Sequence, residues 1–255
     1  MFLRIRSLNH TAKELVGRIE TKVPTVLRLG SVTPTEEIFA FEISKKRAFK
    51  EINTALSCKI SGDKIKMKEA FINSGVLTAE YTILSNSDNW NIFPAIIKHK
   101  HSSKGENIYY ITNNEELIDF KRKHANCENY IIEKYYMYAR EYRLHVTNNG
   151  CFYACRKMLK TDAKIRWHRH ENNSVWILEE NPDFNTPTNW DKIVTECIKA
   201  KNAVGLDIAA IDIKVQTSKH DEPKFIILET NSAPSLGEIG VEKYINCLKN
   251  LVNEI

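Results

Sequence analysis

Short apolar runs alternate with polar residues along most of this chain, and four longer stretches have a helical period. Apolar runs bounded by Gly, Pro, Asn or Asp predict strands, whereas apolar residues repeated every three or four positions predict amphipathic helices. Beyond residue 60 we predict strands that end at Lys98 or span 108–112, 151–159, 206–216 and 225–228, and two more within 130–146 joined by a turn. Helices are expected over 61–75, 113–123, 189–205 and 241–253.

Residues 1–60 have a different pattern, in which short apolar stretches alternate with turn signals such as Gly30 and Pro34. This pattern predicts a small α/β unit of strands with one or two helices. The loop between Arg28 and Thr35 is interpreted as a strand-to-helix connection, or as a loop that presents Ser31 and Thr33 to a ligand. We therefore expect a short N-terminal region over 1–60, followed by a larger domain over 61–255.

The helix predicted over 61–75 begins with a cation and ends at Gly75. Its period places the residues Ile65, Ala70, Phe71 and Ile72 on the inner face. Lys64 lies in the first turn, where a positive charge opposes the helix dipole. Local misfits of this kind sometimes mark functional positions.

The stretch KFIILETNSAPS, residues 224–235, is an apolar strand that carries an acid and an amide near its end. Because side chains alternate along a strand, Glu229 and Asn231 point to one side. Asp212 interrupts the apolar strand before it, and an antiparallel return places this carboxylate beside the other two oxygen donors. Oxygen donors of this kind suit Mg²⁺ shared with phosphates. The alternative is a solvated Glu229 with Asn231 capping the turn before Pro234.

Composition limits the class of protein. The chain has 255 residues, of which 42% are hydrophobic and 27% charged, and its net charge is +5. No stretch approaches the roughly 18 apolar residues of a membrane span. The six cysteines form no CxxC pair, which argues against a zinc site and favours reduced thiols. We expect a soluble cytoplasmic protein without membrane contact, whose oligomeric state the sequence does not reveal.

A polar loop joins the strand ending at Lys98 to the strand over 108–112. Its residues Ser102, Ser103 and Gly105 leave backbone N–H groups free for phosphate oxygens, and Lys98 adds positive charge. The GxxxxGK[ST] pattern of a Walker A loop is absent. The loop is a candidate phosphate contact.

A second polar face and a basic loop follow. Glu141, Arg143 and His145 recur at period two and share one face of a strand, which is either solvated or lines a cleft. Eight basic residues then lie between Arg156 and His170, around Trp167. Such a loop either contacts nucleic acid or closes over a site, and its length favours closure.

Six short motifs resemble the ATP-grasp superfamily in order and rough spacing, over residues 61–255. They are GDK around Lys64, FPAIIK ending at Lys98, IIEKYY around Glu133, EYRLHV around Arg143, GLDIAAIDI around Asp212 and LETNSAPSL around Glu229. The resemblance implies an α+β fold of two lobes that clasp ATP, with residues 1–60 as a truncated preceding region. The last two motifs are most similar to those of ribosomal-protein glutamate ligases and related peptide ligases.

The resemblance also implies roles for individual residues. The nucleotide would be bound by phosphate-contacting lysines, a covering loop, an adenine-contacting hinge and a ribose-binding acid, in chain order Lys64, Lys98, Ser102, Ser103, Gly105, Glu133, Lys134, Tyr135, Tyr136 and Glu141. Mg²⁺ or Mn²⁺ would be held by Asp212, Glu229 and Asn231. Phosphate-directed or substrate-directed roles fall to Arg143, Arg156, Lys157, Arg166 and Asn173.

The function expected from this resemblance is an ATP- and Mg²⁺-dependent carboxylate–amine ligase that forms an amide or peptide bond through an acylphosphate. Its partners would be small-molecule or peptide carboxylates and amines. The phosphate loop is poor in glycine, which favours as an alternative a regulatory or structural module that binds nucleotide without ligase activity. Two further hypotheses are a kinase-like phosphoryl transfer and a nucleic-acid-binding protein that uses the basic loop 156–170.

Overall fold

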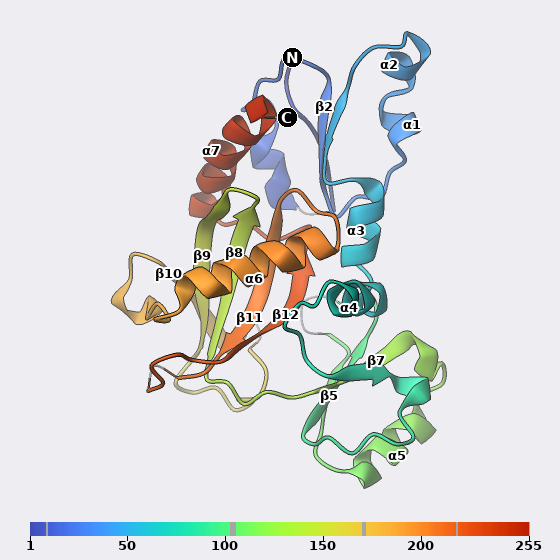
Figure 1. Cartoon of the computed structure of the whole chain (residues 1–255), viewed down its shortest axis with the longest axis vertical. Coiled ribbons are helices and arrows are strands. Elements are labelled where there is room, and N and C mark those ends of the chain that lie inside the picture. Colours follow the sequence, from blue (N-terminus) through green and yellow to red (C-terminus); the bar gives the residue numbers. More distant parts are fainter. Residues whose placement is uncertain (9, 103–105, 170–171, 218, 255) are drawn as a thin grey trace.

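Three β-sheets form the framework of the part of the chain that the structure describes (Figure 1). The structure is a computed structural model that describes residues 1–8, 10–102, 106–169, 172–217 and 219–254. The sheets follow one another along the chain, with the N-terminal sheet at one end of the molecule and the four-stranded sheet at the other.

The first sheet is parallel and has the order β1-β2-β3. It consists of β1 (Arg4–Ser7), β2 (Thr25–Leu29) and β3 (Lys50–Ile52), connected through η1 (His10–Leu15), α1 (Thr35–Ile38) and α2 (Ala40–Ser44). Arg28 is fully buried in β2, where its guanidinium contacts Glu51 at 2.7 Å. These elements match the small α/β unit expected for residues 1–60, although its status as a separate domain stays a prediction.

The second sheet is antiparallel, with the order β4-β7-β5-β6. Its strands are β4 (Tyr81–Ile83), β5 (Ala95–His99), β6 (Ile108–Ile111) and β7 (Tyr130–Lys134), with η2 (Leu84–Asn86) and η3 (Cys127–Asn129) beside them. Helix α5 (Asn114–Lys123) begins at Asn113, whose side chain accepts a hydrogen bond from the backbone of Glu116. Leu117 and Phe120 bury one face of α5 against this sheet.

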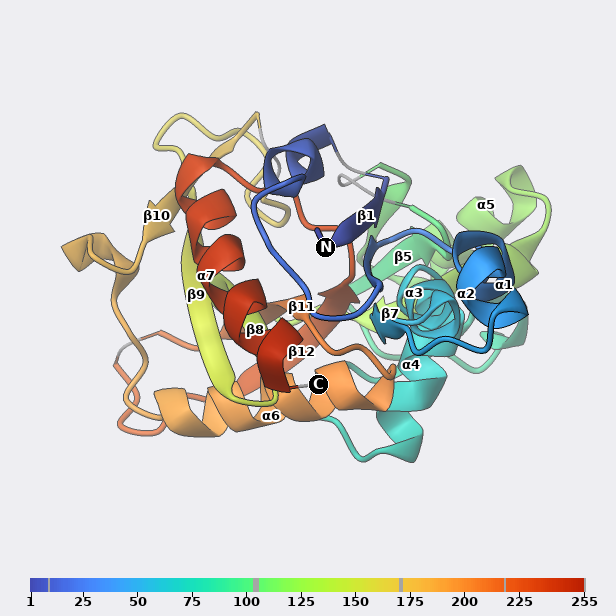
Figure 2. The ribbon, with the colours of Figure 1, turned by 90° about the horizontal axis from the view of Figure 1, so that it is seen from above.

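The third sheet is antiparallel and five-stranded, with the order β10-β9-β8-β11-β12. Its strands are β8 (Arg140–Thr147), β9 (Gly150–Leu159), β10 (Ser174–Leu178), β11 (Ala209–Val215) and β12 (Phe225–Asn231). Helix α6 (Trp190–Ala203) follows the 3-10 turn η4 (Pro182–Phe184), and α7 (Glu238–Glu254) ends the described chain. The two helices lie on opposite sides of the sheet (Figure 2).

The main core lies between α6 and one face of the five-stranded sheet. Tyr142 and Leu144 of β8 are buried there against Ile193 and Cys197 of α6. Since side chains alternate along β8, its residues Glu141, Arg143 and His145 face the other way, as expected. The polar face is therefore free to line a cavity.

Helices α3 (Ala55–Ser61) and α4 (Lys64–Asn73) lie between the sheets. Asp63 caps α4, because its carboxylate accepts hydrogen bonds from the backbone of residues 65 and 66. The buried face of α4 consists of Met67, Lys68 and Phe71. The prediction that Ile72 faces inward is wrong, since Ile72 is 57% exposed, about 100° around the helix from Phe71.

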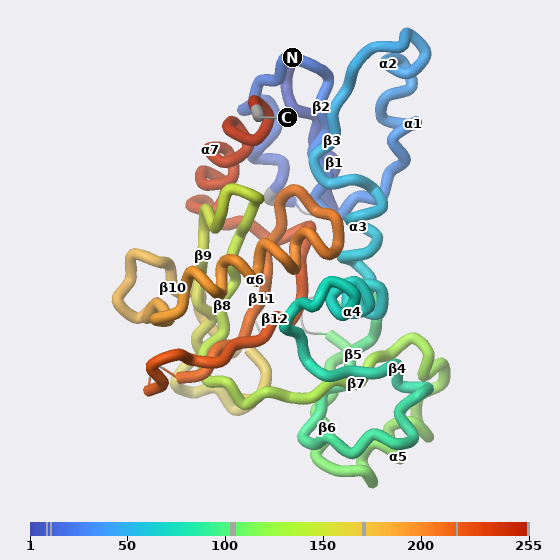
Figure 3. Tube along the Cα trace, viewed as in Figure 1, coloured from blue at the N-terminus to red at the C-terminus, as the bar shows by residue number. Residues whose placement is uncertain are grey.

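The two strands predicted within 130–146 form, but they belong to different sheets. β7 is in the four-stranded sheet and β8 in the five-stranded sheet, so residues 135–139 cross between them (Figure 3). The crossing begins with Tyr135 and Tyr136, the last two residues of the segment 133–136 that the family resemblance assigns to the hinge. In the described part of the chain, no helix combines the length and the apolar character needed to span a membrane.

Candidate active site

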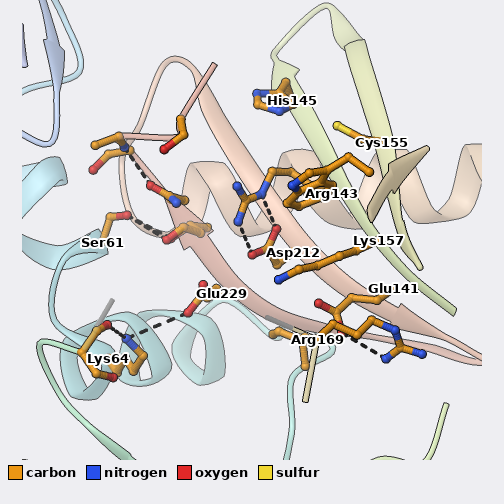
Figure 4. A pocket seen from close by; sticks show the side chains of 18 of the residues that line it. Ser61, Lys64, Glu141, Arg143, His145, Cys155, Lys157, Arg169, Asp212 and Glu229 are labelled. Carbon is orange, nitrogen blue, oxygen red and sulfur yellow. Dashed lines mark hydrogen bonds and ion pairs between the residues drawn. The ribbon is translucent and has the colours of Figure 1, made fainter. Parts of the chain in front are cut away.

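A cavity of about 1010 Å³ lies between the four-stranded and five-stranded sheets. Residues of β5, β6 and β7 line one side, and residues of all five strands of the larger sheet line the other. The N-terminal unit and the segment before α7 close the cavity at one end. Figure 4 shows several of the charged lining residues.

Strand register places charged residues of three neighbouring strands in one row across the cavity floor. Arg143 of β8 lies opposite Asp212 of β11, and Asp212 lies opposite Glu229 of β12. In the next row toward α7, His145 pairs with Ala210, and Ala210 pairs with Asn231. The three oxygen donors predicted from the sequence therefore do come together.

Arg143 and Asp212 form a bidentate ion pair. The guanidinium donates to the carboxylate through Nε at 2.6 Å and through Nη2 at 2.7 Å. Burial alone would raise the pKa of Asp212, but the charge of Arg143 outweighs it and lowers that pKa. The carboxylate is therefore ionised at neutral pH, as a metal ligand must be.

Glu229 and Asn231 are held by different contacts. A carboxylate oxygen of Glu229 lies 3.9 Å from Nζ of Lys64. The Asn231 side-chain oxygen accepts a hydrogen bond of 2.9 Å from the backbone of Ala233, so Asn231 also caps the turn before Pro234. A carbonyl oxygen has a second lone pair, so this hydrogen bond leaves Asn231 able to bind a cation.

The donor set fits a hard cation shared with an anionic ligand. Mg²⁺ prefers oxygen ligands, keeps several waters and commonly uses only one or two protein carboxylates. Among the residues that the structure describes, no group of three His, Cys, Asp or Glu side chains forms a metal cage. Two carboxylates and one amide are consistent with a site that needs ligand oxygens to complete it.

Three lysines gather on the opposite side of the cavity around Glu133 of β7. Lys68 lies 2.9 Å from one carboxylate oxygen of Glu133, and Lys98 pairs with the other. Lys64, one turn before Lys68 on α4, donates to the backbone oxygen of Ser102 at 2.5 Å. Lys64 and Lys98 line the cavity, whereas Lys68 is buried behind them.

This cluster has more positive than negative charge. Burial alone would raise the pKa of Glu133, but the ammonium groups of Lys68 and Lys98 outweigh it and lower the pKa to about 2. Burial lowers the pKa of Lys64. An anion bound between Lys64 and Lys98 would compensate their charge, which suits phosphate oxygens.

The crossing segment forms the far side of the same cavity. Lys214 donates to the backbone oxygen of Tyr136 at 3.2 Å and lies 4.0 Å from the ring centre of Tyr135. Burial lowers the pKa of Lys214 to about 8. Arg169, from the basic loop, contacts the carboxylate of Glu141 at 3.3 Å. Ionic groups thus surround the predicted hinge.

The basic loop covers this end of the cavity. The ring of Trp167 stacks on Tyr110 of β6 with centres 5.3 Å apart, and its backbone oxygen accepts a hydrogen bond from the Tyr135 hydroxyl. Asn173 braces the loop by donating to the backbone oxygens of Ile165 and His168. The loop therefore connects the two sheets across the cavity.

The structure brings most of the predicted site residues together. The cavity is lined by Lys64, Lys98, Ser102, Glu133, Lys134, Tyr135, Tyr136, Glu141, Arg143, Lys157, Asp212, Glu229 and Asn231. Ser103 and Gly105 lie outside the described residues.

Three predicted residues do not reach the cavity lining. Arg156 points to the opposite face of the sheet, where it donates to the backbone oxygen of Asp183 at 2.7 Å. Arg166 is exposed on the basic loop, and Asn173 supports that loop from behind. Side chains alternate along a strand, so Arg156 points away from the cavity because its neighbour Lys157 faces it.

Sequence reasoning missed three ionic residues, Lys68, Arg169 and Lys214. Lys68 follows Lys64 by four positions on a helix, and Lys214 follows Asp212 by two positions on a strand, so each shares a face with a predicted site residue. These spacings are the signals that would have identified them. Arg169 has no comparable signal, because it lies in an irregular loop.

The arrangement of the sheets identifies the fold. The chain is similar to the crystal structure of D-alanine–D-alanine ligase from Bacillus anthracis, with a TM-score of 0.60, 12% identity, and coverage of 90% of this chain and 76% of that one. It is equally similar to the complex of that enzyme with ATP, with a TM-score of 0.60, 13% identity and the same coverage. The chain has the ATP-grasp fold.

The ATP-grasp fold confirms the fold class expected from the six motifs. No protein-family model matches the chain, and no curated protein is a recognisable relative in sequence. The structural neighbours show the fold alone and do not support the finer resemblance to ribosomal-protein glutamate ligases. That subtype therefore stays a prediction.

Proposed function

We propose that this protein is an ATP- and Mg²⁺-dependent carboxylate–amine ligase. The observation that carries the proposal is the convergence, in one cavity of an ATP-grasp fold, of phosphate-suited lysines and metal-suited oxygens. Lys64 and Lys98 face the row that contains Asp212 and Glu229 across the cavity. This arrangement supports a nucleotide whose phosphates lie between the two charged groups.

The proposed reaction begins with attack of a carboxylate oxygen on the γ-phosphorus of ATP. The bond between γ-phosphorus and the bridging oxygen breaks, ADP leaves, and an acylphosphate forms. The amine nitrogen then attacks the acyl carbon, the carbon–oxygen bond breaks, and phosphate leaves as the nitrogen loses a proton. Both steps depend on positioning and charge stabilisation and require no protein nucleophile.

Seven polar residues of the cavity have a part in this proposal. Lys64 and Lys98 bind phosphate oxygens, while Asp212, Glu229 and Asn231 hold the cation. Mg²⁺, when bound, neutralises phosphate charge. Arg143 and Lys157 border the same row and supply positive charge to the reacting carboxylate.

Closure by the basic loop supports a small-ligand site in preference to nucleic-acid binding. Trp167 lines the cavity and its ring is stacked on Tyr110, so that ring face is not free to stack on a base. Nucleic-acid binding would also weaken steeply as salt concentration rises. A modest effect of salt on ligand binding is therefore expected.

The proposal is tested by product analysis across carboxylates and amines, amino acids first, in the presence of ATP and Mg²⁺. Mass spectrometry is expected to find an amide together with ADP and phosphate, and a phosphorylated product without amide would indicate a kinase instead. Glu229→Gln and Asp212→Asn are expected to abolish Mg²⁺-dependent turnover. Glu242→Gln, an exposed acid on α7, is the control. Wild-type rates in either site variant would contradict the proposed metal site.

A further inference from the structure

The cavity extends beyond its charged centre, over strands β9 and β10. The row that contains Glu229, Asp212 and Arg143 continues to Cys155 of β9 and Leu178 of β10. Along the two rows beside it, Trp176 lies opposite Lys157, and Tyr153 lies opposite His145. Apart from Lys157, the residues of β9 and β10 that line the cavity are aromatic or uncharged, whereas β11 and β12 carry Asp212 and Glu229.

Three titratable side chains of the floor at this end, His145, Tyr153 and Cys155, are uncharged at neutral pH. Burial lowers the pKa of His145 to about 3, and its ring shares a hydrogen bond of 2.9 Å with the Tyr244 hydroxyl of α7. Burial raises the pKa of Cys155 to about 11 and also raises that of Tyr153. These three residues therefore offer no charge that could pair with a charged group of a ligand.

Apolar residues also lie on the opposite wall. They are Leu8 and Gly30 of the N-terminal unit, Leu236 before α7 and Ile239 in the first turn of α7. Gly30 has a φ of +79°, and a Cβ there would lie 2.8 Å from Cβ of Ala233, so the two segments meet closely. Among the described lining residues of this end, Glu238 and His10 are ionisable but exposed.

Two cations mark the boundary between the charged and apolar parts. The guanidinium carbon of Arg143 and Nζ of Lys157 lie 5.0 and 5.4 Å from the ring centre of Trp176. Nζ of Lys157 makes no ion pair with any residue in the described part of the chain. A carboxylate at this boundary would neutralise Lys157 and lie beside the row that contains Asp212.

We propose that the carboxylate substrate carries an apolar, preferably aromatic, group that binds over Cys155, Leu178 and Trp176. This assignment rests on the proposed ligase function, because the reacting carboxylate is placed at Arg143 and Lys157. The distance from β8 to β10 is two strand spacings, about 10 Å, which matches a short chain that ends in a ring. Burial of that ring among uncharged side chains favours aromatic carboxylates over carboxylates with a second charged group.

Three carboxylates of similar length test the proposal: 3-phenylpropanoate, glutarate and 5-aminopentanoate. Their binding is measured by calorimetry on the full chain with Mg²⁺ and a non-hydrolysable ATP analogue, so that turnover is not required. We expect 3-phenylpropanoate to bind at least about tenfold more tightly than either charged compound. Equal binding, or tighter binding of glutarate or 5-aminopentanoate, would overturn the proposal.

Variants locate the preference on β10. Trp176→Gln is expected to reduce the preference for 3-phenylpropanoate at least threefold, and Leu178→Asp to shift it toward 5-aminopentanoate. Val175→Asn is the matched control, since Val175 neighbours Trp176, is also 42% exposed and does not line the cavity. Unchanged binding of the ATP analogue shows that each variant is folded. If both site variants still prefer 3-phenylpropanoate to the same extent, the proposed binding of the aromatic group at β10 is wrong.

The binding measurements, combined with product analysis in the presence of ATP, separate this proposal from the proposed function. Preferential binding of 3-phenylpropanoate without any amide product would support the apolar site and contradict the ligase. Amide formation only from carboxylates with a second charged group would support the ligase and overturn the apolar site.

Discussion

Replacement of Lys68 by methionine is expected to destabilise the protein although Lys68 lies behind the cavity. Its side chain is 1% exposed and contacts Glu133 at 2.9 Å and the hydroxyl of Thr78 at 2.6 Å. Methionine has a similar volume but leaves Glu133 with Lys98 as its remaining cation. Removal of one partner from a buried ion pair typically costs about 3–5 kcal/mol. Because Lys98 remains as a partner of Glu133, we expect the free energy of unfolding to fall by about 3 kcal/mol, at the low end of that range.

The pKa of Glu133 gives an independent magnitude. A decrease from 4.5 to about 2 on folding corresponds to about 3 kcal/mol of stability at neutral pH, at roughly 1.4 kcal/mol per pKa unit. Since the folded pKa is the lower one, this stability is present above pH 4.5 and is lost as pH falls toward 2. Lys68→Met raises the folded pKa, so the variant should lose less stability over that window.

Urea unfolding at pH 7 and at several values down to pH 3 measures both effects. Lys66→Met removes the same charge from the exposed face of the same helix and is expected to change stability by less than about 0.5 kcal/mol. In the double variant Glu133→Gln with Lys68→Met, the loss should be smaller than the sum of the two single losses, because both single variants break the same ion pair. Equal stability of the Lys68 and Lys66 variants would refute the reasoning, as would strict additivity in the double variant.

Two further predictions concern stability. Lys214→Met is expected to raise stability by about 1–3 kcal/mol at pH 7, because burial penalises the charged lysine. The pKa of Lys214 is about 8 in the folded state and 10.5 in the unfolded state, so the unfolded state binds more protons between these pH values. Wild-type stability should therefore rise over that window, and the stability difference between Lys214→Met and the wild type should shrink. Urea unfolding at pH 7, 9 and 10.5 checks both expectations. Asp63→Ala removes the cap of α4 and is expected to cost about 1 kcal/mol in thermal unfolding, whereas Asp63→Asn retains most of the stability. A loss as large in Asp63→Asn as in Asp63→Ala would contradict the capping role.

The elements that local pattern determines were predictable from the sequence. Strand period placed Glu229 and Asn231 on one side, and the antiparallel return brought Asp212 opposite Glu229. The same period placed Arg143 on the polar face of β8 but could not show that it pairs with Asp212. That contact depends on which strands become neighbours, which is a property of the whole sheet.

Residues governed by tertiary contacts were less predictable. Lys68 lies on the buried face of α4 because Glu133 offers a partner there, and Glu133 belongs to a strand far away in sequence. Arg156 and Lys157 are equally basic, and only the register of β9 decides that Lys157 faces the cavity. Separation of β7 and β8 into different sheets likewise follows from packing and not from local pattern.

Transfer of oxygen from the carboxylate to phosphate tests the central claim most directly. A carboxylate labelled with ¹⁸O is incubated with ATP, Mg²⁺, an amine and the protein, and the released phosphate is analysed by mass spectrometry. Ligation through an acylphosphate predicts one ¹⁸O atom in each phosphate, equal amounts of ADP and amide, and no transfer by Glu229→Gln. Unlabelled phosphate, or no ADP with any carboxylate and amine, would contradict the account.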